Sequence, residues 1–418
     1  MKRVFKYGGA SVKDAESVRN IPRILADYQE DEVIIVVSAM NKTTNALEEL
    51  VDLALSDELT ALNKLEEIKA YHKGIAAELF NDHDPVFDQL NKFFGEMKIM
   101  VEEYDKTSFD LYYDQLVPYG ELLSTSIISH HLNNTGIKNK WFDARELIIT
   151  DSTFRAARVN WEESKKAISE KVATVLMPGQ PVITQGFIGG DGKHSTTLGR
   201  EGSDFSAAIF ASILDADEVI VWKDVPGYLN ADPKHFNETV KLDRISYSES
   251  IELAFYGAKI IHPKTIRPLQ NKGIPLYVKS FERPADEGSI IQADISADAS
   301  IPSCIIKEDQ VLISISSRDF SFIAEGHLHL IFGLFAKHRC GINLMQNSAI
   351  SFSVCVDKNE RLDALIGDLQ ADFKVKYNEN LRLITIRHYD AETIRKLTLN
   401  REILMEQRSR VTAQMLVK

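Results

Sequence analysis

Lysine, glycine and serine stand together where the first strand-like run of the chain ends. The segment KYGGAS, residues 6–11, follows an apolar run that begins at Val4. Paired glycines, Gly8 and Gly9, let a backbone approach an anion closely, and the Lys6 ammonium would add a positive charge beside it. The same pattern is also found in ordinary strand-to-helix turns. This segment alone therefore leaves phosphate binding and simple connection both open.

A second cluster, TTLGREGSD, residues 196–204, stands before the apolar run FSAAIFASIL. Ser203 or Asp204 would cap the helix that this run predicts, and the helix N-terminus would receive an anion. Arg200 is suited to bidentate contact with a carboxylate, and Asp204 is suited to an ammonium group. A zwitterionic amino acid needs such a pair, whereas the alternative is a capped helix after a flexible loop.

Two further segments place charged residues where strands and helices end. VWKDVPGYLNADPK sets Asp224 directly after a strand, where ligands of open α/β sheets sit, although two turns in succession can be mere connection. YGAKIIHPKTI sets Lys259 at a helix end, a place that also favours a solvated lysine because of the helix dipole. His262 in the same segment is interpreted as a structural or capping residue and not as a base.

Short β-branched runs alternate with helical periodicity through most of the chain, which predicts an α/β domain with a mainly parallel sheet. The predicted strands cover residues 4–7, 33–39, 181–187, 218–222 and 274–278. Between residues 45 and 132 long helices rich in Leu, Glu and Lys replace this pattern. We therefore expect a helical excursion of the kind that can cover a site.

A new strand rhythm begins near residue 300, after the charged, Pro- and Gly-containing stretch FERPADEGSI. Strands over 311–316, 342–346, 350–356 and 373–377, with helices over 326–339 and 362–373, give a ferredoxin-like order. Predicted strands at 381–388, 402–406 and 413–417 with a helix over 391–399 resemble a shortened second copy. The predicted domains are residues 1–298 and 299–418, the latter with one full copy over 308–378 and a shortened copy over 379–418.

Composition restricts the class of protein. The chain has 418 residues, of which 44% are hydrophobic and 26% charged, and its net charge is −12. Such a charge repels nucleic acid and anionic membranes on average. The apolar runs are too short to cross a bilayer, no secretory signal is visible, and the three cysteines lack metal or disulfide spacing. We expect a cytoplasmic globular protein without nucleic-acid or membrane partners.

Taken in order, seven segments resemble the aspartate kinases of the amino-acid-kinase family: KYGGAS, VVSAMNKTTN, YGELLS, TQGFIG, TTLGREGSD, KDVPG and GAKIIHP. Ordered agreement over residues 1–280 is more specific than any single motif. The resemblance implies a three-layer α/β/α kinase domain followed by ferredoxin-like ACT regulatory modules. It also implies transfer of the ATP γ-phosphate to the β-carboxylate of L-aspartate, giving 4-phospho-L-aspartate and ADP in the first step of lysine, threonine and methionine biosynthesis.

The same resemblance assigns roles to individual residues. Lys6 would contact the transferred phosphoryl group, Lys259 the ATP phosphates, and Asp224 would hold these lysines in place. Arg200 would clamp the α-carboxylate of aspartate. The acidic matches near its ammonium are Glu121 and Asp204, the other substrate-lining matches are Ser38, Thr44, Phe187 and Ser203, and the other nucleotide-side matches are Gly8, Gly9, Lys223 and Gly227. Mg²⁺ would be held mainly by the phosphates, so no protein ligand is predicted.

Three positions depart from the family pattern without removing a charge that the reaction needs. Glu201 stands where many members have Gly, Lys223 where Thr or Ser often stands, and Leu229 where some members have Tyr. Glu201 would tune the Arg200 clamp, and Leu229 removes a ring beside the adenine. The acceptor carboxylate is already a nucleophile, so the implied in-line transfer needs no general base.

Other functions compete with aspartate phosphorylation. Another acyl-phosphate-forming kinase, acting on glutamate or N-acetylglutamate, is disfavoured by the pairing of Arg200 with Glu121 and by the regulatory tail. A non-catalytic amino-acid sensor would not need both phosphate lysines. A fused homoserine dehydrogenase would need a G-x-G-x-x-G fingerprint after a strand, which the chain lacks.

The tail segment GINLMQNSAISFSV resembles the effector loop of ACT modules, although an ordinary hairpin would share its pattern. The residues expected to bind an amino-acid effector, lysine or threonine, are Asn343, Gln346, Asn347 and Ser348. Ala349 stands where some lysine-sensitive members carry Glu. Since ACT modules usually pair across subunits, the resemblance also implies a homodimer or a higher homo-oligomer.

Overall fold

The computed structural model describes residues 1–418 except 104, 106, 259 and 320. The chain forms two compact units. The first unit contains Met1–Tyr228, Lys241–Ile251 and Ile260–Ile295, and the second contains Leu229–Val240, Glu252–Lys259 and Ser296–Lys418. Two segments that precede residue 298 therefore belong structurally to the second unit.

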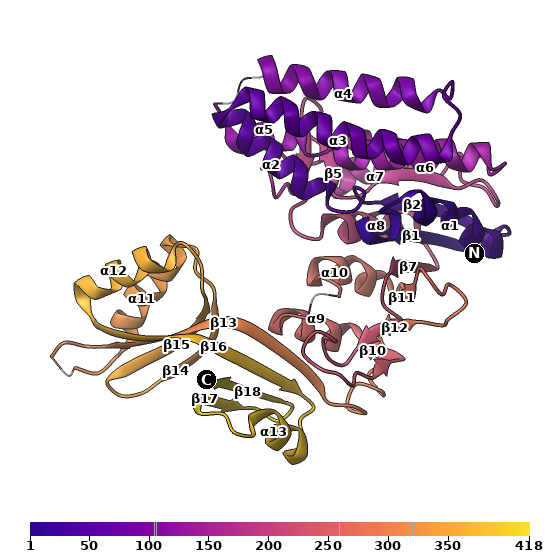
Figure 1. The fold of residues 1–418 in the computed structure, drawn as a ribbon. Coiled ribbons are helices and arrows are strands. Elements are labelled where there is room, and N and C mark those ends of the chain that lie inside the picture. The colour runs from indigo at the N-terminus through magenta and orange to yellow at the C-terminus, as the bar shows by residue number, and fades with distance from the viewer. Residues whose placement is uncertain (104, 106, 259, 320) are drawn as a thin grey trace. The chain divides into compact units, whose positions relative to one another are not determined.

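The first unit is built on an eight-stranded sheet with the order β10-β12-β11-β7-β1-β2-β4-β3 (Figure 1). Its strands are β1 (Lys2–Tyr7), β2 (Glu32–Val37), β3 (Lys140–Trp141), β4 (Val182–Gln185), β7 (Glu218–Lys223), β10 (Arg244–Ser246), β11 (Leu276–Ser280) and β12 (Ser289–Gln292). Neighbouring strands run parallel except for β11 and β12. The predicted, mainly parallel α/β sheet is confirmed.

Helices cover both faces of this sheet, which makes the three predicted layers. Phe5 and Tyr7 of β1 pack in a core cluster with side chains of α1 (Ala15–Leu25) and α6 (Tyr119–Asn134). Successive strand residues point to opposite faces, so Val4 and Lys6 face the side where α8 (Gly202–Leu214) packs on β1, β2 and β7. The remaining helices of this part are α7 (Trp161–Lys171) and α10 (Pro263–Lys272). The helix α9 (Tyr247–Tyr256) begins in the first unit, and its residues from Glu252 onward belong to the second.

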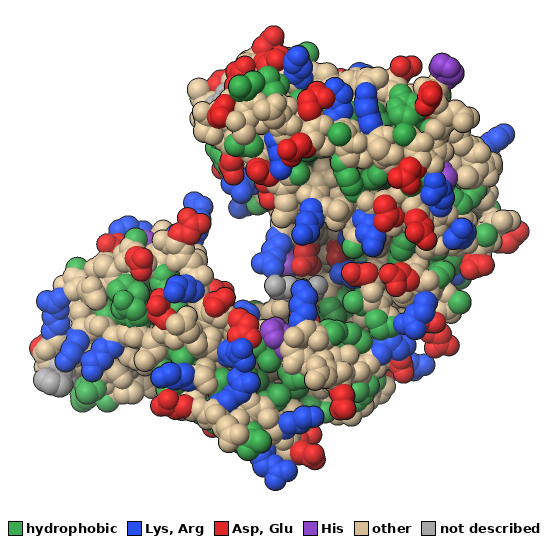
Figure 2. Space-filling model, viewed as in Figure 1, with side chains coloured by type: hydrophobic (Ala, Val, Ile, Leu, Met, Phe, Trp, Pro, Cys, Tyr) green, Lys and Arg blue, Asp and Glu red, His purple; other side chains and the backbone are tan. Residues whose placement is uncertain are grey.

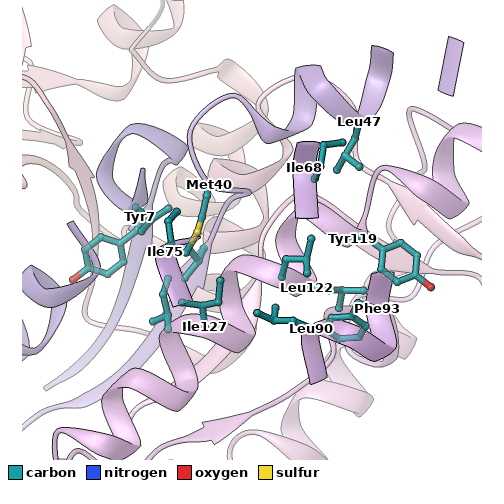
Figure 3. Close-up of a cluster of buried hydrophobic side chains, with 14 of the residues drawn as sticks. Tyr7, Met40, Leu47, Ile68, Ile75, Leu90, Phe93, Tyr119, Leu122 and Ile127 are labelled. Carbon is teal, nitrogen blue, oxygen red and sulfur yellow. The ribbon is translucent and has the colours of Figure 1, made fainter. Parts of the chain in front are cut away.

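The stretch predicted as a helical excursion, residues 45–132, is mainly helical. It consists of α2 (Thr43–Ser56), α3 (Glu58–Leu79), α4 (Val86–Glu103), α5 (Phe109–Leu116) and α6. Figure 3 shows how its helices meet the sheet through a buried apolar cluster, in which the labelled side chains are Tyr7, Met40, Leu47, Ile68, Ile75, Leu90, Phe93, Tyr119, Leu122 and Ile127. Burial of each large apolar side chain contributes about 1.5–3 kcal/mol, so these contacts hold the excursion against the sheet.

The second unit contains a six-stranded antiparallel sheet with the order β14-β15-β13-β16-β18-β17. Its elements are β13 (Ser303–Ser316), α11 (Glu325–Lys337), β14 (Ile342–Asn347), β15 (Ser351–Asp357), α12 (Leu362–Asp372), β16 (Lys374–Arg387), α13 (Ala391–Thr398), β17 (Ile403–Arg408) and β18 (Thr412–Val417). The predicted ferredoxin-like order is confirmed. One prediction was wrong: the two strands expected at 373–377 and 381–388 are the single strand β16.

The two ferredoxin-like copies share their long strands. Residues 312–316 of β13 pair with residues 374–378 of β16, whereas residues 303–307 pair with residues 383–387. Register shifts beside Gln310 separate these two stretches. The shortened copy therefore has four strands. Three come from the part of the chain that follows residue 379, and the beginning of β13 is the other.

The surface agrees with the mixed charge of the sequence. Figure 2 shows Lys and Arg side chains interspersed with Asp and Glu over the visible face of each unit. In the described part of the chain, no helix combines the length and apolarity that a membrane span requires.

Candidate active site

A cavity of about 570 Å³ opens at the carboxyl ends of β1, β2 and β7, beside the first turn of α8. It brings together most of the residues predicted for substrate and phosphoryl binding, namely Lys6, Ser38, Thr44, Glu121, Phe187, Arg200, Ser203, Asp204 and Lys223. Because β1 lies between β2 and β7 in a parallel sheet, the residues that end these strands meet at one edge.

Lys6, Asp204 and Lys223 form the charged centre of this cavity. The Lys6 Nζ lies 2.7 Å from the Asp204 carboxylate, and the Lys223 Nζ lies 3.9 Å from its other oxygen. Although burial opposes the charged form, these two lysines hold the pKa of Asp204 below its ordinary value. Burial lowers the pKa of Lys223, and the attraction of Asp204 opposes that shift.

Asp204 is thus the acid that pairs with Lys6 and Lys223, a contact that the family resemblance did not assign. The predicted role of Asp224 beside Lys6 and Lys259 stays a prediction, since Lys259 lies outside the described residues. Asp224 is exposed and lines a separate depression together with Ser11 and Lys13. The sequence could not show the pairing of Asp204 with Lys6, because Asp204 comes close to Lys6 only through the packing of α8 on β1.

Glu121 lies in the first turn of α6 and is buried. Its Oε1 accepts a hydrogen bond of 3.0 Å from the Ala39 backbone NH, while its Oε2 has no partner in the described part of the chain. Burial raises the pKa of Glu121 to about 8, against the opposing effects of the Ala39 bond and the Lys6 charge. A ligand cation beside this carboxyl group would restore its charged form.

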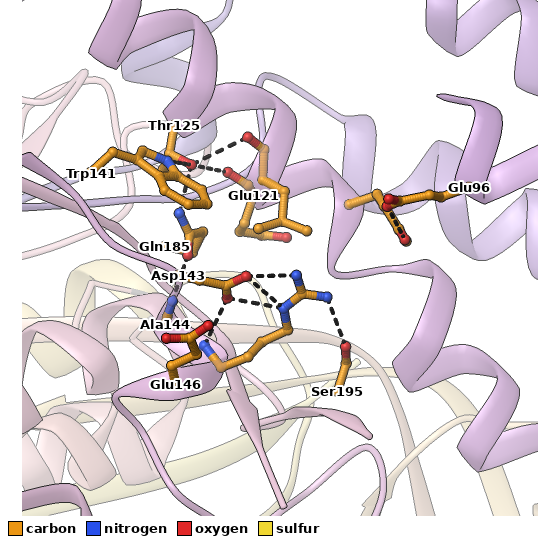
Figure 4. A network of polar contacts seen from close by, with 12 residues as sticks. Glu96, Glu121, Thr125, Trp141, Asp143, Ala144, Glu146, Gln185 and Ser195 are labelled. Atoms are coloured by element: carbon orange, nitrogen blue, oxygen red, sulfur yellow. Dashed lines mark hydrogen bonds and ion pairs between the residues drawn. The ribbon is translucent and has the colours of Figure 1, made fainter. Parts of the chain in front are cut away.

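A polar network fixes the helix that carries Glu121 (Figure 4). The Thr125 hydroxyl donates to the Glu121 carbonyl at 2.8 Å and accepts from the Trp141 indole NH at 3.0 Å and from the Gln185 side chain at 2.8 Å. Gln185 in turn accepts from the Ala144 backbone NH at 2.7 Å. The network ties α6 to β3 and β4, so the Glu121 side chain starts from a fixed backbone.

The turn that follows β4 packs tightly on the start of α8. Phe187 has a φ of +70°, and its backbone NH donates to the Ser206 hydroxyl at 3.0 Å. A Cβ on Gly186 would lie 2.6 Å from the Ser203 Cβ, and a Cβ on Gly202 would lie 2.7 Å from the Phe187 ring. Close contact of these backbones requires glycine at both positions.

The predicted helix cap was wrong. The helix begins at Gly202, so Ser203 and Asp204 lie inside its first turn and not at the N-cap. The N-cap is Glu201, which has a φ of +53° and makes no capping hydrogen bond with its side chain. This leaves the Asp204 carboxylate available to Lys6.

Arg200 is exposed at the mouth of the cavity and forms no ion pair within the described residues. Three further charged or aromatic side chains, which sequence reasoning missed, line the same cavity: Glu48, Tyr113 and Arg155. Glu201, which was predicted to tune the Arg200 clamp, lines it as well. The Tyr113 hydroxyl donates to Glu48 at 2.7 Å, and the Arg155 guanidinium lies 4.7 Å from the centre of the Tyr113 ring. Glu48 and Tyr113 belong to the helical excursion. The prediction that this excursion can cover a site was the one feature of the sequence that could have indicated them.

The predicted nucleotide-side residues divide into two groups. Lys6 and Lys223 line the cavity, whereas Gly8, Gly9, Asp224 and Gly227 do not. A Cβ on Gly9 would lie 2.6 Å from the Asn41 carbonyl oxygen, so this glycine lets the loops after β1 and β2 touch. Lys259 lies outside the described residues. His262 is the N-cap of α10 and accepts from the Lys264 NH at 3.1 Å, which confirms its predicted capping role.

The predicted effector residues fall into two groups, one exposed and one held within the sheet. Gln346, Asn347 and Ser348 are exposed at the end of the edge strand β14. Asn343 on the same strand is held in hydrogen bonds within the sheet. Its side chain is therefore not presented to the loop.

Known proteins are similar to this chain in both sequence and fold. A sequence model of the amino acid kinase family matches residues 1–280. The lysine-sensitive aspartokinase 3 of Escherichia coli (strain K12) is 29% identical over 398 residues, which cover 92% of this chain and 86% of that protein.

Two solved structures share the fold over nearly the whole chain. The E. coli aspartokinase III complex with aspartate and ADP (R-state) has a TM-score of 0.84 at 26% identity and covers 100% of this chain and 96% of that chain. The complex of E. coli aspartokinase III with lysine and aspartate (T-state) has a TM-score of 0.82 at 26% identity and covers 99% and 95%. The resemblance predicted from the ordered motifs is confirmed, and the chain belongs to the amino acid kinase family.

Proposed function

We propose that this chain is an aspartate kinase, which transfers the γ-phosphoryl group of MgATP to the β-carboxylate of L-aspartate. One observation carries the proposal: the cavity that holds the buried Lys6–Asp204 pair also holds Arg200, whose guanidinium has no acidic partner among the described residues. Arg200 would bind the α-carboxylate, and Lys6 would face the transferred group. The similar E. coli aspartokinase III binds aspartate and ADP.

Catalysis would consist of positioning and charge neutralisation. The aspartate β-carboxylate is ionised at neutral pH and attacks the γ-phosphorus in line, with ADP leaving. Lys6 and Lys223 would offset the negative charge on the phosphoryl oxygens, and Asp204 would keep both ammonium groups close together. No proton needs to be removed from the acceptor, so the site needs no general base.

Mg²⁺ would enter as part of the substrate MgATP, held by the nucleotide phosphates. Among the described residues, no group of three or more His, Cys, Asp or Glu side chains is arranged to hold a metal ion. We therefore assign no protein ligand to it.

Glu121 would bind the ammonium group of aspartate. Its Oε2 is buried and without a partner in the described part of the chain. An ammonium group placed there would supply the missing contact and stabilise the ionised carboxylate. Together, Arg200 and Glu121 would recognise the two ends of an α-amino acid.

The test is release of ADP with a panel of acceptors, with hydroxylamine to trap the acyl phosphate. We expect turnover with aspartate, and much less with glutamate, N-acetylglutamate or β-alanine. β-Alanine lacks the α-carboxylate and would leave Arg200 unpaired, which costs at least about a hundredfold in kcat/KM. Equal turnover of β-alanine and aspartate would remove the Arg200 assignment, and no turnover of any acceptor would favour a sensor without catalysis.

We further propose that the first unit catalyses and the second unit senses an end product, lysine or threonine. The similar E. coli aspartokinase 3 is lysine-sensitive. An effector inhibits only if it binds the inactive arrangement more tightly, and the exposed loop after β14 offers Gln346, Asn347 and Ser348 for that binding. A Ser348→Leu variant should need at least about tenfold more effector for half inhibition.

Gln407 provides a matched control, because it is exposed on β17, the other edge strand of the same sheet. A Gln407→Leu variant should respond to the effector like the unmodified chain. A loss of response in both variants, or in neither, would contradict a sensing site at the end of β14.

A homodimer or higher homo-oligomer is proposed on the same grounds. The edge strand β14 has a free backbone edge in the described sheet, and Met345 on it is 52% exposed. Light scattering after size-exclusion chromatography measures the assembly directly, and a monomer at micromolar concentration would contradict this proposal.

A further inference from the structure

A lysine in the first turn of α10 reaches the loop that carries Arg200. The Lys264 Nζ donates to the Leu198 backbone carbonyl at 2.9 Å, across 66 positions of the sequence. The same Nζ lies 4.7 Å from the centre of the Phe205 ring, which belongs to the first turn of α8. One ammonium group therefore contacts both the loop that leads to Arg200 and the helix that follows it.

The backbone from which Lys264 extends is held at the start of its helix. The Lys264 NH donates to the His262 side chain at 3.1 Å, and Pro263 is the first residue of α10. Proline at this position is already restricted to the helical φ. The helix α10 packs on α8 within the first unit. The Lys264 side chain therefore starts from a fixed point beside α8.

The surroundings of the Lys264 ammonium favour its contact with the Leu198 carbonyl. Lys264 lines a cavity of about 690 Å³ formed mainly by α7, α8 and α10, and among the described residues that line this cavity none is acidic. Burial lowers the pKa of Lys264. A charged donor is stronger than a neutral one, and the ring of Phe205 adds a cation–π contact.

Leu198 anchors the backbone two residues before Arg200. It is buried, and its NH donates to the Phe187 carbonyl at 2.8 Å while its own carbonyl accepts from Lys264. The residues on either side of Arg200 have positive φ values, +75° at Gly199 and +53° at Glu201. Since the Arg200 side chain forms no ion pair within the described residues, the backbone on either side determines its place.

We propose that Lys264 is a positioning residue for aspartate binding, which holds the loop that presents Arg200. The inference rests on the proposed function, in which Arg200 binds the α-carboxylate. Lys264 is not among the residues that line the active-site cavity, so it acts through the loop and not by touching the substrate. An arginine that is held in place before the ligand arrives loses less entropy on binding.

The nucleotide side should not respond to this loop. Lys6 and Lys223, which are proposed to face the phosphoryl group, are held by their own ion pairs with Asp204. Weaker support of the Leu198 carbonyl would therefore reduce the affinity for aspartate and leave the affinity for MgADP nearly unchanged.

The experiment measures the Kd for aspartate by calorimetry at saturating MgADP, and the Kd for MgADP alone, in the full chain. Lys264→Met keeps the stem and removes the ammonium, whereas Lys264→Arg keeps a charged donor. Lys272→Met is the matched control, because Lys272 lies on the same helix and pairs with the exposed Asp215 at 2.5 Å.

We expect the aspartate Kd to rise at least about fivefold in Lys264→Met, because the buried Leu198 carbonyl loses its donor. Lys264→Arg should recover at least about half of this loss on a logarithmic scale. The MgADP Kd of each variant, and both Kd values of Lys272→Met, should stay within about twofold of the unmodified chain.

A double-mutant cycle tests whether Lys264 acts through Arg200. In that case, adding Lys264→Met to Arg200→Ala should lower kcat/KM for aspartate no further than Arg200→Ala alone. A further loss as large as in the unmodified chain would overturn the proposed route. The melting temperature shows that each variant is folded, and Lys264→Gln, which removes the charge and shortens the side chain, replaces Lys264→Met if that variant does not fold.

Two other results would overturn the positioning role: an unchanged aspartate Kd in folded Lys264→Met, and an equal loss of aspartate and MgADP binding. Failure of the proposed function is seen separately. An unmodified chain that binds aspartate but releases no ADP refutes the catalytic assignment and leaves the comparison of Kd values valid. An unmodified chain that binds no aspartate overturns both.

Discussion

Lys6 is the residue on which the proposed chemistry depends most directly. Its ammonium is buried at the end of β1, 2.7 Å from Asp204, and points to the face of the sheet where α8 begins. The Lys6→Ala variant should lower kcat by at least about a hundredfold, since loss of one donor to the transition state costs on the order of 3 kcal/mol. Steady-state ADP release measures this change.

The control for Lys6 is Lys166, an exposed lysine of α7. Lys166→Ala should turn over normally. Asp204 keeps Lys223 nearby in the Lys6→Ala protein, so we expect that variant to fold. Near-normal kcat in folded Lys6→Ala would end its assignment to the phosphoryl group.

Glu121 makes stability depend on pH in a defined direction. Burial raises its pKa to about 8 from an ordinary value of 4.5, so between these values the folded protein retains a proton that the unfolded chain has released. The free energy of unfolding should therefore fall as pH rises through this window, by on the order of 5 kcal/mol in the unliganded protein. Glu121→Gln, which cannot ionise, should lose markedly less stability over the same range in urea unfolding experiments.

Glu66 is an exposed carboxylate of α3 and serves as the reference for this measurement. Glu66→Gln should follow the pH dependence of the unmodified chain. Parallel stability curves for Glu121→Gln and the unmodified chain would show that Glu121 is not the titrating group. Saturating aspartate should flatten the curve of the unmodified chain if its ammonium lies beside Glu121.

The sequence motifs predicted most side chains of the cavity but not those that belong to no motif. Lys6, Arg200 and Ser203 belong to motifs whose order along the chain was informative, and they line one cavity. Tyr113 and Arg155 belong to no motif. Their place in the cavity depends on the contact between the helical excursion, which carries Tyr113, and the later loop that carries Arg155. The pairing of Lys6 with Asp204 could not be predicted without the packing of a helix on a strand.

Among the elements, the loops after β1 and β2 meet with no room for a side chain. The Asn41 NH donates to the Gly9 carbonyl at 2.9 Å, and a Cβ on Gly9 would lie 2.6 Å and 2.8 Å from two backbone carbonyl oxygens. Gly9→Ala must push these loops apart. We expect it to lower the free energy of unfolding by about 2 kcal/mol or more and to raise the KM for MgATP.

Gly74→Ala is the control that shows whether the destabilisation by Gly9→Ala comes from the loop contact. It lies on the exposed side of α3 with open space where a Cβ would stand, so Gly74→Ala should stabilise the protein by about 0.5–1 kcal/mol. Denaturant unfolding compares the two variants. A Gly9→Ala protein as stable as the unmodified chain would mean that the loops can separate without cost.

Elements were predicted well where side-chain periodicity was continuous and poorly where the backbone was irregular. Two strands were predicted, over 373–377 and 381–388, and the polar residues between them, Asn378, Glu379 and Asn380, belong to β16. Asn380 does adopt a φ of +58°, yet the strand continues through it beside the register shift in β13. Asn and Asp tolerate this conformation, so a polar interruption does not distinguish a bulge from a turn.

At the scale of the whole molecule, the second unit contains two segments that precede residue 298 in addition to the C-terminal region proposed to sense an end product. The segment Leu229–Val240 belongs to it: Ala231 and Phe236 pack in an apolar cluster with Ile384, Ile386 and Met415. A chain truncated after residue 298 would leave this segment without its core. Loss of the contacts of Phe236 alone costs on the order of 2 kcal/mol.

We therefore expect the truncated chain to lose MgADP binding as well as any response to lysine or threonine. Calorimetry measures the first, and binding of a hydrophobic dye reports the exposed cluster. The full-length Ser348→Leu variant is the comparison, since it should lose the response and keep nucleotide binding. A truncated chain that binds MgADP normally would show that the second unit is dispensable for the nucleotide.

The shared strands of the second unit restrict how such proteins can exchange parts. Since β13 and β16 each contribute one stretch to either half of the sheet, residues 308–378 form one half and divide the other, which consists of residues 303–307 and the chain after residue 379. A recombination that imported residues 308–378 from a relative would leave residues 303–307 attached to a foreign strand and paired with a native one. New effector specificity is thus more easily acquired by substitutions in loops such as the one after β14 than by replacement of a whole module.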